Sequence, residues 1–200
     1  LQRPWIPDQV RYDNLTKFRS DNQTTICPPF AHDLHLTTSA PTDLTPMHLS
    51  ALTLASLPAD IHTPIYDRRR HAPGVVHLGL GAFHRAHQAM VFDQLLSAGD
   101  TRWGIHGVGM TRPDLVNQLK AQDGLYAVRI ADGQGVQWQV PGALWRTSVA
   151  TTERDAVVQA IAAPSTRWVT LTVTEKGYTP ALGQLLLDGL RLRQQGGLPG

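Results

Sequence analysis

An apolar run, Val75-Val76-His77-Leu78, leads directly into Gly79-Leu80-Gly81-Ala82-Phe83-His84-Arg85-Ala86-His87-Gln88. The run predicts a buried strand, and a helical period of apolar residues begins after the second glycine. At such a junction the first glycine lets the chain turn tightly, and the second lets backbone approach a pyrophosphate. The helix that follows directs its free N–H groups and its positive dipole end at the phosphate charge. The segment therefore predicts a dinucleotide-binding turn built on Gly79 and Gly81.

This glycine pattern is one residue short of the usual dinucleotide fingerprint. His84 stands where the third glycine normally lies. From spacing alone, an ordinary strand-to-helix turn remains an open alternative. Arg85 lies within one turn of the expected phosphate position, and a guanidinium pairs well with phosphate or with a carboxylate.

Short apolar runs alternate with helical stretches along the rest of the chain. The expected strands are Val75–Leu80, Trp103–Met110, Leu125–Ile130, Val136–Val140 and Arg167–Thr174. Helices are expected at Arg85–Ala98, at Pro113–Ala121, from a Thr152 cap to Ala162, and at Pro180–Gln195. Asp132-Gly133-Gln134-Gly135 is typical of a hairpin turn. The order predicts the α/β class: a Rossmann-like parallel sheet with helices on both faces and an inserted β-hairpin.

Composition excludes several kinds of partner. The chain has 200 residues, 42% apolar and 17% charged, with a net charge of +2. Its basic residues are scattered, which argues against nucleic acid. No apolar run approaches the ~20 residues that span a bilayer, so no membrane partner is expected. The single cysteine, Cys27, cannot form an internal disulfide, which fits a cytoplasmic location.

The first 46 residues differ from the rest of the chain. They mix Pro, Thr, Asp, Asn and Gln without a helical or strand period. A more regular pattern begins at Met47. We expect residues 1–46 to be a disordered or artefactual extension and residues 47–200 to form an NAD-binding Rossmann domain.

An acidic residue follows the second expected strand. In dinucleotide sites a carboxylate at this place binds the adenosine ribose hydroxyls. Asp114 could accept the 2′-hydroxyl and repel a 2′-phosphate, which favours NAD over NADP. Two other interpretations stay open: Asp114 suits the first turn of a helix through the dipole, and Arg112 could pair with a 2′-phosphate.

Two further groups of polar residues invite a functional interpretation. His84, His87, His77 and His71 suggest a metal, but no Cys, Asp or Glu completes a familiar set of ligands. We therefore expect no metal. Glu175 follows the last strand, at the edge of a parallel sheet where ligands bind. From the residue spacing alone, an exposed turn containing Glu175 and Lys176 is the favoured interpretation.

Four motifs resemble the polyol-specific long-chain dehydrogenases, the family of mannitol 2-dehydrogenase and fructuronate reductase (mannonate oxidoreductase). They are residues 79–88, Trp103-Gly-Ile-His-Gly-Val-Gly-Met110, Gln122-Asp-Gly-Leu-Tyr126 and Leu171-Thr-Val-Thr-Glu-Lys-Gly-Tyr178. The resemblance covers Met47 to the end of the chain. It implies a zinc-independent, NAD(P)-dependent oxidoreductase that interconverts a sugar alcohol or aldonate with a ketose or keto-uronate.

The resemblance also assigns roles to residues. It implies that Glu175 lies beside the nicotinamide and relays a proton, against the interpretation from spacing. The expected cofactor-binding residues are Gly79, Gly81, Phe83, His84, Arg85, Asp114 and Thr174. The family's catalytic lysine belongs to a helical C-terminal domain that is not in this sequence, so we expect an incomplete domain without catalytic activity of its own. The alternative is a non-catalytic nucleotide-binding or regulatory module ending near residue 200.

Overall fold

The computed structural model describes residues 49–196, apart from residues 69, 112, 133, 134, 173, 175 and 176. The expected extension at residues 1–46, the start at Met47, and Cys27, Arg112 and Glu175 lie outside the described residues.

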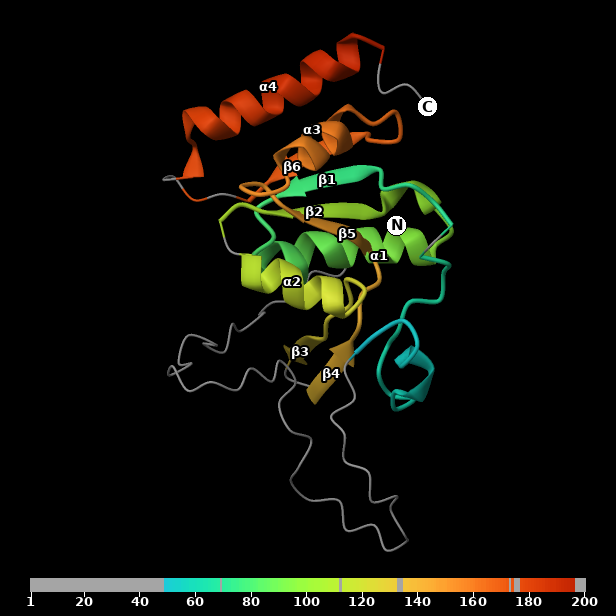
Figure 1. Ribbon diagram of the computed structural model, residues 1–200. Helices are drawn as coiled ribbons and strands as arrows, with labels where there is room; N and C mark the ends of the chain where they lie inside the picture. The colour runs from blue at the N-terminus through green and yellow to red at the C-terminus, as the bar shows by residue number, and fades with distance from the viewer. Residues whose placement is uncertain are drawn as a thin grey trace, which may run out of the picture.

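A four-stranded parallel sheet forms the centre of the molecule, in the order β5-β2-β1-β6. Helices cover both faces, with α1 and α2 on one side and α3 and α4 on the other (Figure 1). The strands are β1 (Val75–Leu78), β2 (Ile105–Gly109), β5 (Leu144–Val149) and β6 (Trp168–Leu171). The helices are α1 (Ala89–Ser97), α2 (Pro113–Ala121), α3 (Arg154–Ala162) and α4 (Pro180–Gln194). The predicted Rossmann-like class is confirmed.

The strands bury side chains on both faces, as expected for a parallel sheet that is covered on each side. Val75 and Ile105 face α1 and α2, where Phe92 and Leu96 complete one apolar cluster. The alternate residues face α3 and α4 in a second cluster, which contains Val76, Leu78, Val108, Val157, Ile161, Leu182 and Leu185. Because β1 is buried on both sides, its sequence is apolar almost throughout, and this explains why it was readily predicted.

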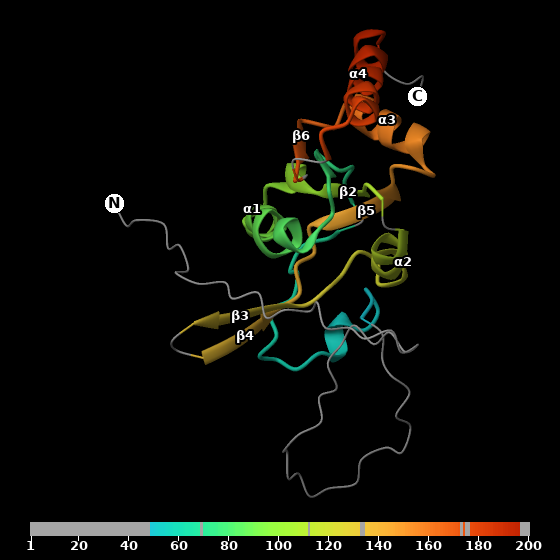
Figure 2. The same ribbon diagram turned by 90° about the vertical axis from the view of Figure 1, so that its left-hand side faces the viewer.

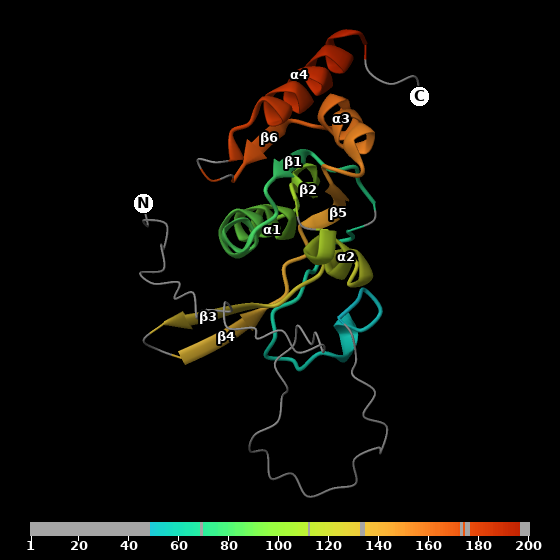
Figure 3. The same ribbon diagram turned by 60° about the vertical axis from the view of Figure 1, so that its left-hand side comes forward.

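The predicted hairpin forms from β3 (Val128–Asp132) and β4 (Gly135–Gln139), which pair antiparallel. It projects away from the main sheet, on the side of α1 and α2 (Figures 2 and 3). The buried Asp93 carboxylate of α1 fastens its base. Asp93 accepts hydrogen bonds from Gln139 Nε2 (3.2 Å), from the Gly142 backbone N–H (2.6 Å) and from the Tyr66 hydroxyl (2.5 Å).

Several predicted boundaries were wrong. Strand β5 was not predicted, because it lies at the edge of the sheet and its exposed Arg146 interrupts the apolar pattern. Helix α3 begins at Arg154 with Glu153 as N-cap, not with the predicted Thr152 cap. The Glu153 carboxylate accepts from the Val149 N–H (2.7 Å) and so holds the preceding loop. The first hairpin strand starts at Val128 rather than Leu125, because Leu125 and Tyr126 are buried, Tyr126 in the first apolar cluster.

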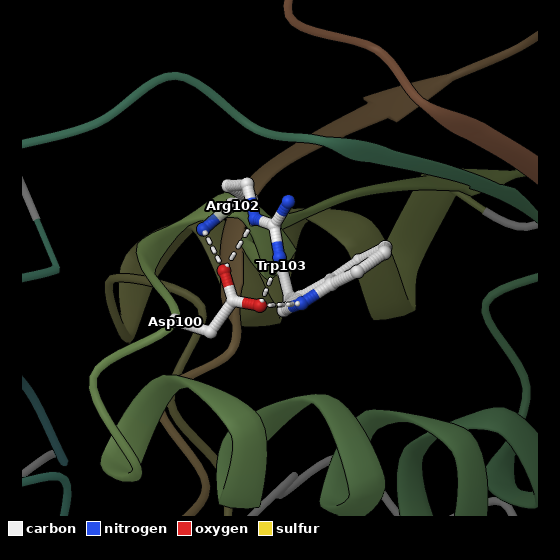
Figure 4. Close-up of polar contacts among 3 residues, drawn as sticks. All are labelled: Asp100, Arg102 and Trp103. Atoms are coloured by element: carbon white, nitrogen blue, oxygen red, sulfur yellow. Dashed lines mark hydrogen bonds and ion pairs between the residues drawn. The ribbon is translucent and has the colours of Figure 1, made fainter.

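A polar turn joins α1 to β2 and sets where that strand begins. Figure 4 shows the Asp100 carboxylate held between Arg102 and Trp103. It accepts from Arg102 Nε (2.7 Å) and Trp103 Nε1 (2.7 Å), and the hydrogen bonds from Arg102 lower the pKa of Asp100. Trp103 is thereby placed against Phe92, with ring centroids 5.7 Å apart. No helix within the described residues is long and apolar enough to cross a membrane.

Candidate functional site

The order of the strands locates a crevice for ligands. From β1 the chain adds β2 and β5 on one side and then places β6 on the other side of β1. In open parallel sheets, ligands bind beyond the carboxyl ends of the strands at such a reversal. The carboxyl ends of β1 and β6 are followed by Gly79 and Thr172 respectively. The predicted phosphate turn therefore lies at the switch point of the sheet.

Gly79 is required there for two independent reasons. Its φ of +103° lies in a region that L side chains rarely adopt. An added Cβ would also lie only 2.2 Å from the Thr172 carbonyl oxygen. The position therefore needs glycine both for the turn and for the close approach of β6.

Gly81 fits the role of the second glycine. It is exposed, and an added Cβ would meet only the Gly79 carbonyl oxygen, at 3.9 Å. The structure itself therefore leaves room for a side chain, so the glycine keeps the space in front of the turn clear. Helical backbone begins at residue 82, immediately after this position. Backbone N–H groups at a helix start are suited to an anion.

Arg85 places a half-buried guanidinium beside this helix start. Its Cζ lies 5.5 Å from the centre of the Tyr126 ring, and the Tyr126 hydroxyl donates to the Arg85 carbonyl oxygen (2.9 Å). Its Nε is buried without a partner, and within the part of the chain that the structure describes no carboxylate pairs with it. Burial lowers the pKa of this guanidinium. The side chain is thus a partly desolvated cation that an anion would complement.

His84 does not face the solvent but lies fully buried against β1. Its ring stacks on His77 with centroids 3.5 Å apart and planes within 9°. Burial lowers the pKa of His84 to about 3, helped by repulsion from His77, and burial lowers the pKa of His77 to about 4. Both rings are therefore neutral near pH 7. That His84 contacts the cofactor directly stays a prediction.

The other predicted residues lie in segments that follow the carboxyl ends of β1, β2 and β6. Phe83 is 59% exposed and lies 4.7 Å from the His87 ring. Thr174 is exposed beyond β6 and accepts from the Gly177 N–H (2.7 Å). Asp114 is exposed in the first turn of α2, and it has no hydrogen bond or ion pair with the residues described. Glu175 lies outside the described residues.

The sequence did not predict three polar residues that form hydrogen bonds behind the glycine turn. They are Gln88, Thr170 and Thr172, all of which bond to the histidine pair. The available signal was His77, a polar residue inside an apolar strand. A buried polar group needs hydrogen-bonding partners, so it predicts a polar neighbourhood.

No metal cluster of three or more His, Cys, Asp or Glu side chains occurs among the described residues. The histidines considered for a metal are used in ring contacts instead: His77 with His84, His87 with Phe83, and His71 with Trp145. The absence of a resident metal stays a prediction.

A groove of about 480 Å³ lies elsewhere, along the open edge of β5. Its lining includes Arg68, Lys120, Trp145 and Arg146, and it contains none of the predicted site residues. It is separated from the switch point by β2, so it is not the candidate cofactor site.

Comparison with known proteins agrees with this geometry. Residues 73–200 match the family model of the mannitol dehydrogenase Rossmann domain. The chain belongs to the mannitol dehydrogenase family. Its sheet and glycine turn are therefore those of the Rossmann domain of that family.

Relatives of the mannitol dehydrogenase family carry named activities. The chain is 39% identical to the polyol:NADP oxidoreductase of Gluconobacter oxydans over 63% of this chain and 27% of that protein. It is 40% identical to the mannitol 2-dehydrogenase of Cereibacter sphaeroides over 58% of this chain and 25% of that protein. The chain thus spans less than a third of these relatives.

A solved structure shows the same fold. It is the Pseudomonas fluorescens mannitol 2-dehydrogenase, in a ternary complex with NAD and D-mannitol. It superposes with a TM-score of 0.69 at 27% identity, over 77% of this chain and 37% of that one. The family and the Rossmann-like fold that the sequence predicted are both confirmed.

Proposed function

We propose that this chain supplies the cofactor-binding domain of an NAD-dependent oxidoreductase. The complete enzyme interconverts a sugar alcohol or aldonate with a ketose or keto-uronate, of the mannitol/fructose or mannonate/fructuronate type. Its substrate is a small polyol or sugar acid, and its setting is the cytoplasm. The group that exchanges a proton with the substrate lies outside the present sequence.

One observation carries this proposal. At the switch point of the sheet, an obligatory glycine turn is followed by an open second glycine and, in the helix start, by Arg85, whose guanidinium is partly desolvated. Arg85 lacks an acidic partner among the described residues, while the helix start beside it offers backbone donors. A diphosphate has the charge and the acceptors that both features need.

Each remaining residue has a role in this proposal. Gly79 and Gly81 shape the turn, Arg85 and the helix start hold the diphosphate, and Phe83 and Thr174 border the crevice. Asp114 binds the adenosine ribose and disfavours a 2′-phosphate. The nicotinamide, when bound, carries the hydride. Glu175 relays the proton between the reacting centre and solvent.

The choice between NAD and NADP is the finer part of the proposal, since the relatives include an NAD complex and an NADP-dependent enzyme. Support for NAD comes from Asp114, whose carboxylate has no partner in the described part of the chain. Calorimetry on the full-length protein should give tighter binding of NADH than of NADPH. Asp114→Asn should narrow the difference, because the repulsion of a 2′-phosphate is lost.

Arg85→Gln should raise the Kd for both NADH and NADPH about tenfold or more, because a charged partner of the diphosphate is removed. Arg102→Gln is the matched control, since Arg102 lies in the turn before β2, where its guanidinium donates to Asp100 and lies over the Trp103 ring. If neither NADH nor NADPH binds to the natural protein, the proposal is wrong. Binding without any turnover of polyols or sugar acids would favour the non-catalytic module.

Glu175→Gln tests the proton relay. Turnover should fall while cofactor affinity stays unchanged, because the substitution removes an ionisable group and keeps the shape. A turnover rate equal to that of the natural enzyme across the pH profile would remove Glu175 from the mechanism.

A further inference from the structure

The position of the missing third glycine holds an aromatic ring that packs against β1. In the usual fingerprint this glycine allows close packing of the helix on the strand. Here the flat His84 ring lies parallel to the His77 ring at 3.5 Å between centroids. A parallel stack of two planar rings fixes both the separation and the orientation of the helix start relative to the strand.

The helix start that contains this ring is a π-helical turn at His84–Gln88. The Ala89 N–H donates to the His84 carbonyl oxygen, five residues earlier, so the turn holds one extra residue. Turns of this kind inside α-helices are frequent at functional sites. The same turn brings the Gln88 side chain back to His84, where Gln88 Oε1 accepts from His84 Nδ1 (2.9 Å).

The stack is also connected to β6 and to the phosphate turn. His77 Nδ1 lies 2.8 Å from Thr170 Oγ1, which in turn lies 3.2 Å from Gln88 Oε1. A neutral imidazole has a single N–H. Because Nε2 uses it toward Thr172, Nδ1 accepts from the Thr170 hydroxyl. On the other side of the ring, His77 Nε2 lies 2.8 Å from Thr172 Oγ1, which donates to the Gly79 carbonyl oxygen (2.7 Å). The helix start, β1, β6 and the glycine turn are therefore joined in one buried network.

This arrangement is not the one that stability alone would favour. His84 Nε2 is buried without a hydrogen-bond partner among the described residues. An unpaired buried nitrogen destabilises the folded state, and an apolar side chain would avoid that.

We propose that the His77–His84 stack is a positioning device for the dinucleotide, which holds the turn at residues 79–83 and the helix start in the conformation that binds the diphosphate. The inference rests on the proposed function of the same site. His84 then acts through the turn as a positioning residue and does not itself contact the reacting atoms.

Paired substitutions in the full-length protein separate shape from polarity. His84→Phe keeps a flat ring on His77, so its Kd for NADH should stay within about threefold of the natural value. His84→Gln keeps a polar group near Gln88 but removes the stack, and its Kd should rise about tenfold or more, because small displacements of binding groups are costly. The KM for cofactor should rise in parallel, while the KM for the polyol stays constant.

A second pair tests the link between the stack and the turn, because the Thr172 hydroxyl contacts both His77 Nε2 and the Gly79 carbonyl oxygen. Thr172→Ser keeps the hydroxyl that donates to Gly79, whereas Thr172→Val removes it at similar volume. Only Thr172→Val should raise the Kd for NADH. Tyr66→Phe is the control for a general loss of stability, because it removes a buried hydrogen bond to Asp93 in a different network.

Equal affinities for His84→Phe and His84→Gln, or for the two Thr172 variants, would overturn the inference. A comparable loss of affinity in Tyr66→Phe would do the same, since it would trace the effect to stability. Failure of the natural protein to bind either cofactor is a different result, because it contradicts the proposed function itself.

Discussion

At the scale of single residues, the site depends on positions that few other amino acids could occupy. Gly79 combines a positive φ with a backbone neighbour that leaves no room for a Cβ. Arg85 keeps a cation half-buried, and His84 replaces a glycine with a stacked ring. The sequence identified the glycine turn and Arg85 from their spacing. It did not reveal the stack, because His77 lies in β1 whereas His84 lies in the helix start, and the supporting Thr172 follows β6.

The first prediction concerns Gly79. Gly79→Ala should lower the free energy of unfolding by about 2 kcal/mol or more, because unfavourable φ and a steric clash act together. Gly99→Ala is the matched control: Gly99 has a φ of +92° but nothing within 4 Å of an added Cβ. It should cost about 1 kcal/mol, for the backbone conformation alone. Urea unfolding measures the free energy of unfolding of both variants. Equal losses would show that the close approach of Thr172 does not contribute to the effect of Gly79→Ala.

At the scale of elements, the parallel strands and their helices were largely predictable, since buried strands are apolar on both faces. Strand β5 was not, because an edge strand beside an exposed groove carries polar residues such as Arg146. The hairpin turn was located correctly, but its first strand was placed too early. Tertiary burial of Leu125 and Tyr126 produced an apolar pattern that belongs to the core and not to the hairpin.

The second prediction concerns the attachment of the hairpin to α1. Tyr66→Phe should lower the free energy of unfolding by about 1–3 kcal/mol, because it removes one hydrogen bond to the buried Asp93 carboxylate. Asp93→Ala should cost more, since it also leaves the Gly142 N–H without its acceptor. A double-mutant cycle on Tyr66 and Asp93 should give a coupling energy clearly above zero. Additive effects would mean that the contact does not stabilise the hairpin base.

At the scale of the whole molecule, the fold buries three histidines: His77 in β1, His106 in β2 and His84 in the helix start. His106 bonds to Ser148 (2.9 Å), and burial, together with the charge of Arg146, lowers its pKa to about 4. His77 and His84 are shifted in the same direction. The folded state therefore disfavours protonation at each of these sites.

The third prediction follows from these shifts. Unfolded histidine titrates near 6.5, so below that pH the unfolded chain binds more protons than the folded one. The stability from these neutral rings is complete above about pH 6.5 and is lost as the pH falls toward 4. The midpoint of urea unfolding should therefore decrease from pH 7 to pH 5.

Carboxylates explain little of this window. The pKa of Glu153 is lowered by its hydrogen bonds from Lys120 and from the Val149 N–H, so its carboxylate stays ionised as the pH falls from 7 to 5. His106→Gln is the control variant and should lose less stability between pH 7 and pH 5 than the natural protein. An unchanged midpoint across this range would show that the histidines are not kept neutral by burial.

The hydrogen bond from Thr172 to the Gly79 carbonyl has a consequence for synthesis of the chain. Its two residues are 93 positions apart, and β6 follows β1, β2 and β5 in the sequence. While the ribosome is still adding residues before Trp168, the emerging chain can pair its first three central strands, but the turn lacks its support. The ability to bind a dinucleotide therefore arises late in synthesis, only after β6 has paired with β1.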